Sequence, residues 1–286
     1  MPSYSRAQVR RRQRLVLAVA AVILLLLIGG CTRLLIGVFG DGRSPFEADD
    51  EAMSVPETPA DAAAHEQLPE NIVLEADEVM GIDVSSYQQE IDWEQVAGDG
   101  YGFAYIKATE GAGYTDARIR ENWEGAQAAG ITPGAYHYFT LCSPGAEQAE
   151  DFLAAVPPDD TALPPALDLE FDGACDERPE ADDAQAEIDA FTAAVEEAWG
   201  RRMVIYSSSQ WREHYGLPAT DSRPDWLYAG AGRPGQDDWA VWQLRFDGEV
   251  SGIEGEVDID VARIEVLRDH AEIPSGEEEL THAPEE

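Results

Sequence analysis

The chain has 286 residues, of which 57 are acidic and 19 are basic, and its formal net charge at neutral pH is −38. A hydrophobic content of 44% suits one sizeable globular core rather than a disordered polymer. Because so negative a chain repels the phosphate backbone, nucleic acid is not expected as a partner.

The first 40 residues have the opposite charge pattern. No acidic residue precedes Asp41, whereas six arginines do. Residues 15–32 form an uncharged, mostly apolar run that at ~1.5 Å per residue nearly crosses a ~30 Å hydrocarbon core. Basic residues before such a run favour export of the chain beyond it. Residues 1–40 are therefore predicted to be a signal or membrane-anchor segment.

The three cysteines refine this prediction. Cys31 ends the sequence IGGC, which resembles a lipobox, so that Cys31 is a possible lipidation site. If Cys31 is lipidated or lies in the membrane, Cys142 and Cys175 remain as a pair in an oxidising compartment, where a disulfide is expected. Two buried thiols are the alternative.

Composition divides the rest of the chain into three parts. Residues 41–78 are rich in Asp, Glu, Ala and Pro with few aromatic residues, and they are predicted to be a disordered acidic linker. Residues 269–286 are predicted to be a disordered acidic tail for the same reason. The catalytic domain is therefore expected to span residues 79–268.

Strand-like and helix-like segments alternate within that domain. Helical patterns over 91–100, 117–130, 143–156 and 180–200 separate the earlier strand-like runs, and the later runs come one after another more directly. This order predicts an α/β fold, an irregular TIM-like barrel whose last strands lack regular helices. A doubly wound open sheet is the alternative. The strand-like runs are 79–85, 102–110, 134–140, 165–171, 202–208, 225–230, 240–244 and 256–261.

Four acids lie near the ends of these apolar strands, where barrels of this kind carry their catalytic residues. They are Asp83, Asp168, Glu170 and Asp258. Because strand side chains alternate, Asp168 and Glu170 share one face, about 7 Å apart. Like charges in a partly desolvated cleft raise one pKa, so one acid of this pair is expected to hold a proton near neutral pH and to serve as a general acid.

The motifs, taken in order, resemble glycoside hydrolase family 25, the muramidase-type lysozymes. They are GIDVSSYQ, IDW, YIKATEG followed by Tyr114, GAYHYF, LDLE, IYSS, VWQ and VDID, spanning roughly residues 81–264. The resemblance implies an irregular α/β barrel that hydrolyses the β-1,4 bond between N-acetylmuramic acid and N-acetylglucosamine in peptidoglycan. With the anchor segment, it implies a monomer acting at the outer face of the bacterial cytoplasmic membrane or in the cell wall; secretion after signal cleavage is the alternative.

The resemblance also implies roles for individual residues. Glu170 would be the general acid/base, Asp168 would stabilise the intermediate, and Asp83 and Asp258 would orient the substrate and tune the other two acids. Seven residues match substrate-binding positions of the cleft: Lys107, Tyr114, His137, Tyr138, Tyr206, Trp242 and Gln243. Each has an ordinary alternative, since strand aromatic residues more often belong to a core and Lys107 could simply neutralise Asp83.

Two other functions fit parts of this pattern. A chitinase-like enzyme also uses a DxE pair on a barrel strand, and an inactive wall-binding module would need only the aromatic residues. The complete set of four acids argues against the inactive module. No metal or cofactor is implied, because the five histidines show no HExxH or other paired spacing.

Overall fold

The computed structural model describes residues 53–171, 175–216, 223–230, 232–235 and 239–273. The predicted segment 1–40, with Cys31, and residues 274–286 of the predicted tail lie outside these ranges. Within them, no helix is both long and apolar enough to cross a membrane.

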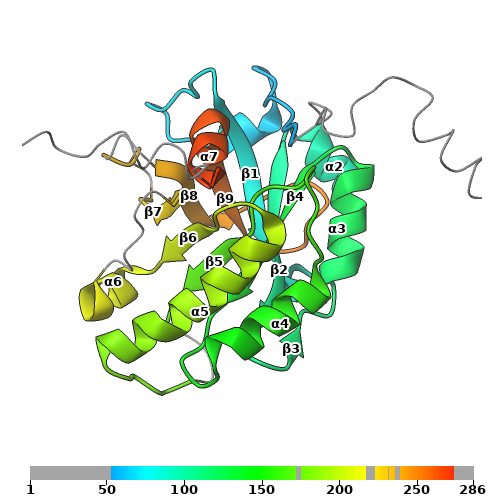
Figure 1. Cartoon of the computed structure of the whole chain (residues 1–286). Helices are drawn as coiled ribbons and strands as arrows, with labels where there is room; N and C mark the ends of the chain where they lie inside the picture. The colour runs from blue at the N-terminus through cyan, green and yellow to red at the C-terminus, as the bar shows by residue number, and fades with distance from the viewer. Residues whose placement is uncertain (1–52, 172–174, 217–222, 231, 236–238, 274–286) are drawn as a thin grey trace, which may run out of the picture. The chain divides into compact units, whose positions relative to one another are not determined.

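A closed barrel forms the centre of the fold (Figure 1). Around it the strands have the order β1, β2, β4, β5, β6, β7, β8 and β9, and pairing of β9 with β1 closes the ring. All neighbouring strands are parallel except β9, which is antiparallel to β1 and β8. The short strand β3 extends β2 outside the ring. The bounds are β1 Glu78–Val84, β2 Phe103–Glu110, β3 Tyr114–Thr115, β4 Thr132–Tyr138, β5 Ala166–Leu169, β6 Val204–Ser207, β7 Asp225–Tyr228, β8 Trp239–Gly248 and β9 Val257–Arg263.

Helices cover the outside of the barrel unevenly. The described residues between β7 and β8, and between β8 and β9, contain no helix. The irregular barrel is therefore confirmed, and the β1–β2 and β1–β9 pairings exclude the open sheet. The longest helix, α5, buries Ile188, Phe191, Val195 and Trp199 along one face. The bounds are α2 Trp93–Gly98, α3 Ile119–Ala128, α4 Gly145–Ala155, α5 Ala181–Trp199, α6 Ser209–Tyr215 and α7 Ile264–Ala271, with short 3₁₀ helices η1 Ala63–Gln67 and η2 Ser86–Gln88.

The core has an inner and an outer layer. Tyr105 of β2 and Trp226 of β7 do not lie on neighbouring strands, yet their ring centroids are 4.8 Å apart, so they meet across the barrel interior. Ile106, the residue after Tyr105 on β2, belongs instead to the buried cluster that contains the helix residues Phe152 and Phe191. Leu167 of β5 belongs to the same cluster. Consecutive residues of one strand thus enter different layers.

The prediction of a disordered linker does not hold for residues 53–77. Met53 and Ala64 are buried, and the Met53 amide donates to the carbonyl of Asp160 over 3.2 Å. Leu68, Ile72 and Leu74 pack against the outer core. The average composition of this stretch is polar, but several of its few apolar residues are buried in the core or packed against it, whereas Val73 is exposed.

The predicted tail also begins too early. Helix α7 continues to Ala271, which is buried, and Glu272 forms an isolated bridge with Arg201. Residues 269–272 thus belong to the folded domain, because the apolar face of α7 extends beyond Arg268.

Candidate active site

The four predicted acids lie at one end of the barrel. Asp168 is the third residue of β5 and only 9% exposed, and Glu170 comes directly after that strand and is half-buried. Asp83 lies near the carboxyl end of β1 and is paired in register with Asp258. Because β9 is antiparallel, its start lies at the same end as the carboxyl ends of the parallel strands, and this brings Asp258 to the cluster.

Gln243 of β8 joins two of these acids. Its Nε2 atom donates to Asp83 Oδ2 over 2.9 Å and to Asp258 Oδ2 over 3.3 Å. Its own Oε1 atom and Asp168 Oδ1 are buried, and neither has a hydrogen-bond partner among the described residues. Buried polar atoms of this kind are usually satisfied, so both point to a ligand or water at this position.

Burial raises the pKa values of the acids. It raises the pKa of Asp83 to about 6, although the hydrogen bond from Gln243 lowers it. Burial, Asp83 and Glu170 raise the pKa of Asp258 to about 9. Burial, with the charges of Glu170 and Asp83, also raises the pKa of Asp168 well above its usual range. The cluster therefore holds protons at neutral pH.

Lys107 lies on one side of the cluster. Its Nζ atom is 2.6 Å from Glu110 Oε2 and lies 4.8 Å from the centroid of the Tyr138 ring and 5.9 Å from that of Tyr114. The positive charge of Lys107 lowers the pKa of Asp168. Its ion-pair partner is Glu110, so the alternative that Lys107 only neutralises Asp83 does not describe its contacts.

Two tyrosines line the inner end of the cluster. Burial and the charges of Glu170, Asp168, Asp83 and Asp258 raise the pKa of Tyr206. Burial and several of the same charges raise the pKa of Tyr136, which was not among the predicted site residues. Both phenols therefore stay protonated and can donate hydrogen bonds among the carboxylates.

His137 does not belong to the cleft, contrary to the prediction. It is fully buried in the outer layer, where its ring stacks on Phe191 with a centroid separation of 4.5 Å. Its Nδ1 atom lies 2.7 Å from Thr109 Oγ1, and its Nε2 atom lies 2.9 Å from Gln148 Oε1. Burial lowers its pKa to about 4, so it is a neutral core residue.

Trp242 is also placed differently from the prediction. It is fully buried in the outer layer, where it packs against Trp239, and its indole Nε1 donates to the carbonyl of Gly230 over 3.2 Å. Because Gln243 faces the acids, its neighbour Trp242 must face outward.

A fifth acid, Asp260, lies beneath the cluster and was not predicted. It is fully buried, and the indole Nε1 of Trp226 donates to its Oδ1 over 3.0 Å. Burial and the nearby Asp83 and Asp258 raise its pKa well above the usual range. Strand alternation in VDID could have identified it, since residues 258 and 260 share a face.

A hollow of about 280 Å³ opens beside Glu170. Its lining includes Glu170 and Tyr206 from the cluster together with the exposed aromatic side chains Tyr228 and Phe246. The charged and aromatic residues that line this hollow are Glu170, Phe171, Tyr206, Arg212, Tyr228 and Phe246.

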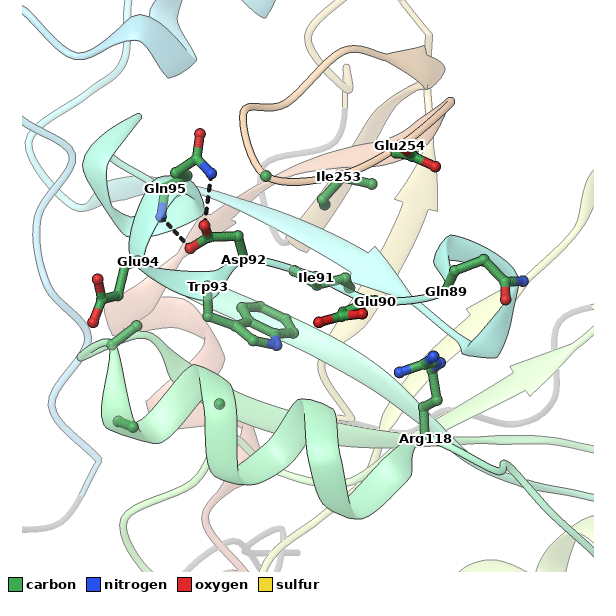
Figure 2. A pocket seen from close by; sticks show the side chains of 14 residues that line it. Gln89, Glu90, Ile91, Asp92, Trp93, Glu94, Gln95, Arg118, Ile253 and Glu254 are labelled. Carbon is green, nitrogen blue, oxygen red and sulfur yellow. Dashed lines mark hydrogen bonds between the residues drawn. The ribbon is translucent and has the colours of Figure 1, made fainter.

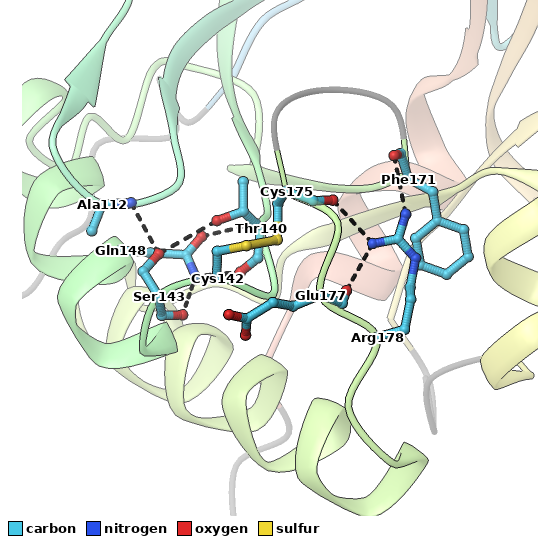
Figure 3. The surroundings of a disulfide bond; sticks show 9 residues. All are labelled: Ala112, Thr140, Cys142, Ser143, Gln148, Phe171, Cys175, Glu177 and Arg178. Atoms are coloured by element: carbon cyan, nitrogen blue, oxygen red, sulfur yellow. Dashed lines mark hydrogen bonds between the residues drawn. A yellow bond between two sulfur atoms is a disulfide. The ribbon is translucent and has the colours of Figure 1, made fainter.

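A disulfide between Cys142 and Cys175 stands next to this end of the barrel (Figure 3). The two cysteines come after β4 and β5, and their Cα atoms are 5.8 Å apart. Arg178 donates to the carbonyls of Cys175 and Phe171, and its guanidinium lies 4.0 Å from the centroid of the Phe171 ring. The bridge therefore holds the chain that leads from Glu170 to α5.

A larger hollow, of about 950 Å³, lies elsewhere (Figure 2). It is bounded by α2, α3 and the loop between β8 and β9, and none of the predicted site residues lines it. Asp92 at its wall caps α2 by accepting from the Gln95 amide. Among the described residues, no group of three or more His, Cys, Asp or Glu side chains is arranged to hold a metal ion.

Residues 82–253 match the family Glycosyl hydrolases family 25. The chain belongs to this family. It is therefore a glycoside hydrolase, and its closed α/β barrel is like that of solved family 25 structures. The match begins at Ile82, so the packed segment 53–77 precedes the part that is shared with the family.

Known proteins of the family resemble the chain over the same region. Lysozyme M1 of Streptomyces globisporus is 35% identical over 196 residues, which cover 63% of this chain and 66% of that protein. The structure of a family 25 glycosyl hydrolase from Bacillus anthracis has a TM-score of 0.61 at 32% identity and covers 67% of this chain and 91% of that one. The structure of a bacterial lysozyme from Streptomyces coelicolor has a TM-score of 0.59 at 30% identity and covers 69% of this chain and 100% of that one.

Proposed function

We propose that this enzyme is an N-acetylmuramidase that cleaves the β-1,4 bond between N-acetylmuramic acid and N-acetylglucosamine in peptidoglycan. The observation that carries the proposal is the pairing of buried Asp168 with half-buried Glu170 beside a hollow that can take a sugar. The relatives that are named lysozymes support peptidoglycan as the substrate.

In this mechanism Glu170 is the general acid. We place one proton on the Asp168–Glu170 pair at neutral pH, because burial and the negative charge of Glu170 raise the pKa of Asp168 well above its usual range. Glu170 lines the hollow and gives this proton to the glycosidic oxygen as the bond to the anomeric carbon breaks. The N-acetylglucosamine hydroxyl then leaves, and both carboxylates are charged at the moment when positive charge develops on the sugar.

Asp168 stabilises that positive charge. Two acids two residues apart on one strand are poorly placed to flank a sugar from opposite faces, which favours attack by the substrate's own acetamido oxygen. The resulting oxazolinium lies against the Asp168 carboxylate. Water then adds to the anomeric carbon and gives a proton back to Glu170, so that the pair is restored and one water is consumed.

The surrounding residues position the substrate. Gln243 holds Asp83 and Asp258 together, and these acids set the charge around the reacting sugar. Lys107, Tyr138 and Tyr114 form a charged and aromatic wall that suits a sugar face and an acetamide or lactyl carboxylate.

Product analysis tests this function. The full chain is incubated with purified peptidoglycan, and the new reducing ends are identified by mass spectrometry. We expect muropeptides that end in reducing N-acetylmuramic acid. Reducing N-acetylglucosamine ends, or cleavage of chitin oligosaccharides in preference to peptidoglycan, would favour a chitinase-like enzyme instead, and binding without any release would indicate an inactive wall-binding module.

We also propose that the enzyme acts outside the cytoplasmic membrane, tethered through residues 1–40. The basic start and the apolar run at 15–32 support this. Cell fractionation of wild type and Cys31→Ala separates the forms of tether. A lipoprotein loses processing or membrane retention on substitution, whereas a spanning helix is unaffected. Recovery of wild type in the medium, cut after the apolar run, would contradict tethering.

A further inference from the structure

Two aromatic side chains near the cluster are exposed and stacked on each other. Tyr228 at the end of β7 is 51% exposed, and Phe246 on β8 is 47% exposed. Their ring centroids are 4.3 Å apart, with 27° between the ring planes. Exposed aromatic faces of this kind are costly in water and are typical of ligand-binding surfaces.

The aromatic pair lines two hollows. One is the hollow of about 280 Å³ that contains Glu170. The other has about 620 Å³, within the ~300–1,000 Å³ typical of small-molecule sites. Both hollows are bounded by Tyr228 and Phe246, so the second continues the first away from the carboxylates.

The far wall of the second hollow comes from the packed segment that precedes the barrel. Glu66, Gln67, Leu68 and Pro69 line it. Gln67 fixes this wall, because its Nε2 donates to the carbonyl of Glu249 over 2.9 Å and its Oε1 accepts from Arg245 Nη1 over 3.3 Å. This wall lies outside the residues that match the family.

We propose that this second hollow is a distal subsite, which binds a further N-acetylhexosamine of the same glycan strand that is cleaved at Glu170. The proposal rests on the proposed function and adds a length preference to it. The Tyr228–Phe246 pair supplies a face for the sugar ring, and Arg245 and Asp247 supply donors and acceptors for hydroxyl and acetamide groups. Glu66 and Asp247 at the rim repel a lactyl carboxylate, so that the neutral N-acetylglucosamine of the strand is the fitting ligand at this position.

Cleavage of substrates of different length tests the subsite. The full chain is assayed on a tetrasaccharide and an octasaccharide of alternating N-acetylglucosamine and N-acetylmuramic acid. We expect wild type to have a higher kcat/KM on the octasaccharide, and Phe246→Ala to lower the ratio of the two kcat/KM values about five- to tenfold, mainly through KM. Ile273→Ala removes an exposed aliphatic side chain that lines neither hollow and should leave the ratio unchanged.

If the ratio of the two kcat/KM values is the same in wild type and Phe246→Ala, the proposed subsite is rejected, but the proposed muramidase activity is not. If wild type cleaves neither substrate, the proposed function fails, and binding decides the subsite separately. Calorimetry then compares the affinity of Glu170→Gln and of Glu170→Gln/Phe246→Ala for the octasaccharide. Binding that is about five- to tenfold weaker in the double variant supports the subsite, and equal affinities reject it.

Discussion

The amide of Gln243 donates to Asp83 across 2.9 Å and thereby offsets part of the effect of burial on that acid. The pKa of Asp83 is raised to about 6, and without the amide it would be higher still. A glutamine thus keeps one acid of a crowded cluster ionisable close to neutral pH.

Gln243→Leu tests this relationship. The change keeps the size of the side chain but removes the hydrogen bond to the charged form of Asp83. If ionised Asp83 is needed for activity, the acidic limb of the kcat/KM profile moves to higher pH by about one pH unit. Gln185→Leu is the matched control, because Gln185 also donates to a carboxylate, Asp189, but on the exposed side of α5. An unchanged acidic limb in Gln243→Leu would show that Asp83 does not control the reaction.

Substitution of the acid pair tests the proposed chemistry. Glu170→Gln cannot give up a proton, so turnover on peptidoglycan should fall ~10²–10⁴-fold while binding survives. Asp168→Asn should also cut turnover severely, because an amide cannot stabilise an oxazolinium. The melting temperature should hold or rise in both variants, since repulsion within the cluster is relieved. The exposed Glu197→Gln should change neither quantity. Near-normal turnover of Glu170→Gln would reject its role, and unfolding in parallel with lost activity would make the acids structural.

The sequence predicts the barrel and the position of its acids because both arise from a periodic pattern. The prediction of cleft residues from the sequence is less accurate where two adjacent residues of one strand were both assigned to the cleft. His137 with Tyr138, and Trp242 with Gln243, cannot share a face of one strand, and in each pair the structure turns one residue to the outer core. Tyr136, by contrast, lies on the face that alternation gives to Tyr138.

Other features depend on tertiary packing that no local pattern records. Strand alternation places Asp260 on the same face as Asp258, but its complete burial depends on packing, because acidic residues are usually exposed. The stretch 53–77 has the composition of a linker, yet Met53 and Ala64 are buried, and Leu68, Ile72 and Leu74 pack against the outer core. Sequence averages miss such contacts because they ignore where each apolar residue falls.

The stability of the protein should fall as the pH rises, owing to the raised pKa values. Burial raises the pKa of Asp258 to about 9 in the folded state, from about 3.8 in the unfolded state. Between these pH values the native state binds more protons than the unfolded state, so the free energy of unfolding falls as the pH increases. Asp258→Asn removes this group. Its melting temperature at pH 8 should exceed that of wild type by a few degrees, and the gain should vanish near pH 4.

The matched control for this prediction is Asp247→Asn. Arg245 lowers the pKa of the exposed Asp247, so its substitution should bring no gain at pH 8. An equal gain in both variants would show that overall negative charge, rather than the buried position of Asp258, sets the pH dependence.

The disulfide should stabilise the fold. Cys142 and Cys175 are 33 residues apart, and on the chain-entropy model closing such a loop contributes ~3.5 kcal/mol, so that the Cys142→Ser/Cys175→Ser variant should melt ~7–14 °C lower. A reductant should lower the melting temperature of wild type and leave the double variant unchanged. Alkylation of both thiols in native exported protein would show that the bridge is not formed.

The packed segment before the barrel should contribute to folding. Removing residues 53–77 exposes the surface beneath Leu68, Ile72 and Leu74 and loses the buried Met53 and Ala64, so fragment 78–273 should be at least ~3 kcal/mol less stable than fragment 53–273 and melt ~6–12 °C lower.

Two neighbouring residues of the segment give a matched comparison. Ile72→Ala should lower the melting temperature of the full chain because Ile72 packs on the outer core, whereas Val73→Ala should not, because Val73 is 79% exposed. Thermal denaturation of the two fragments and the two variants measures each contribution. If the fragments melt together and Ile72→Ala equals Val73→Ala, the segment adds no stability and behaves as the linker that its composition predicts.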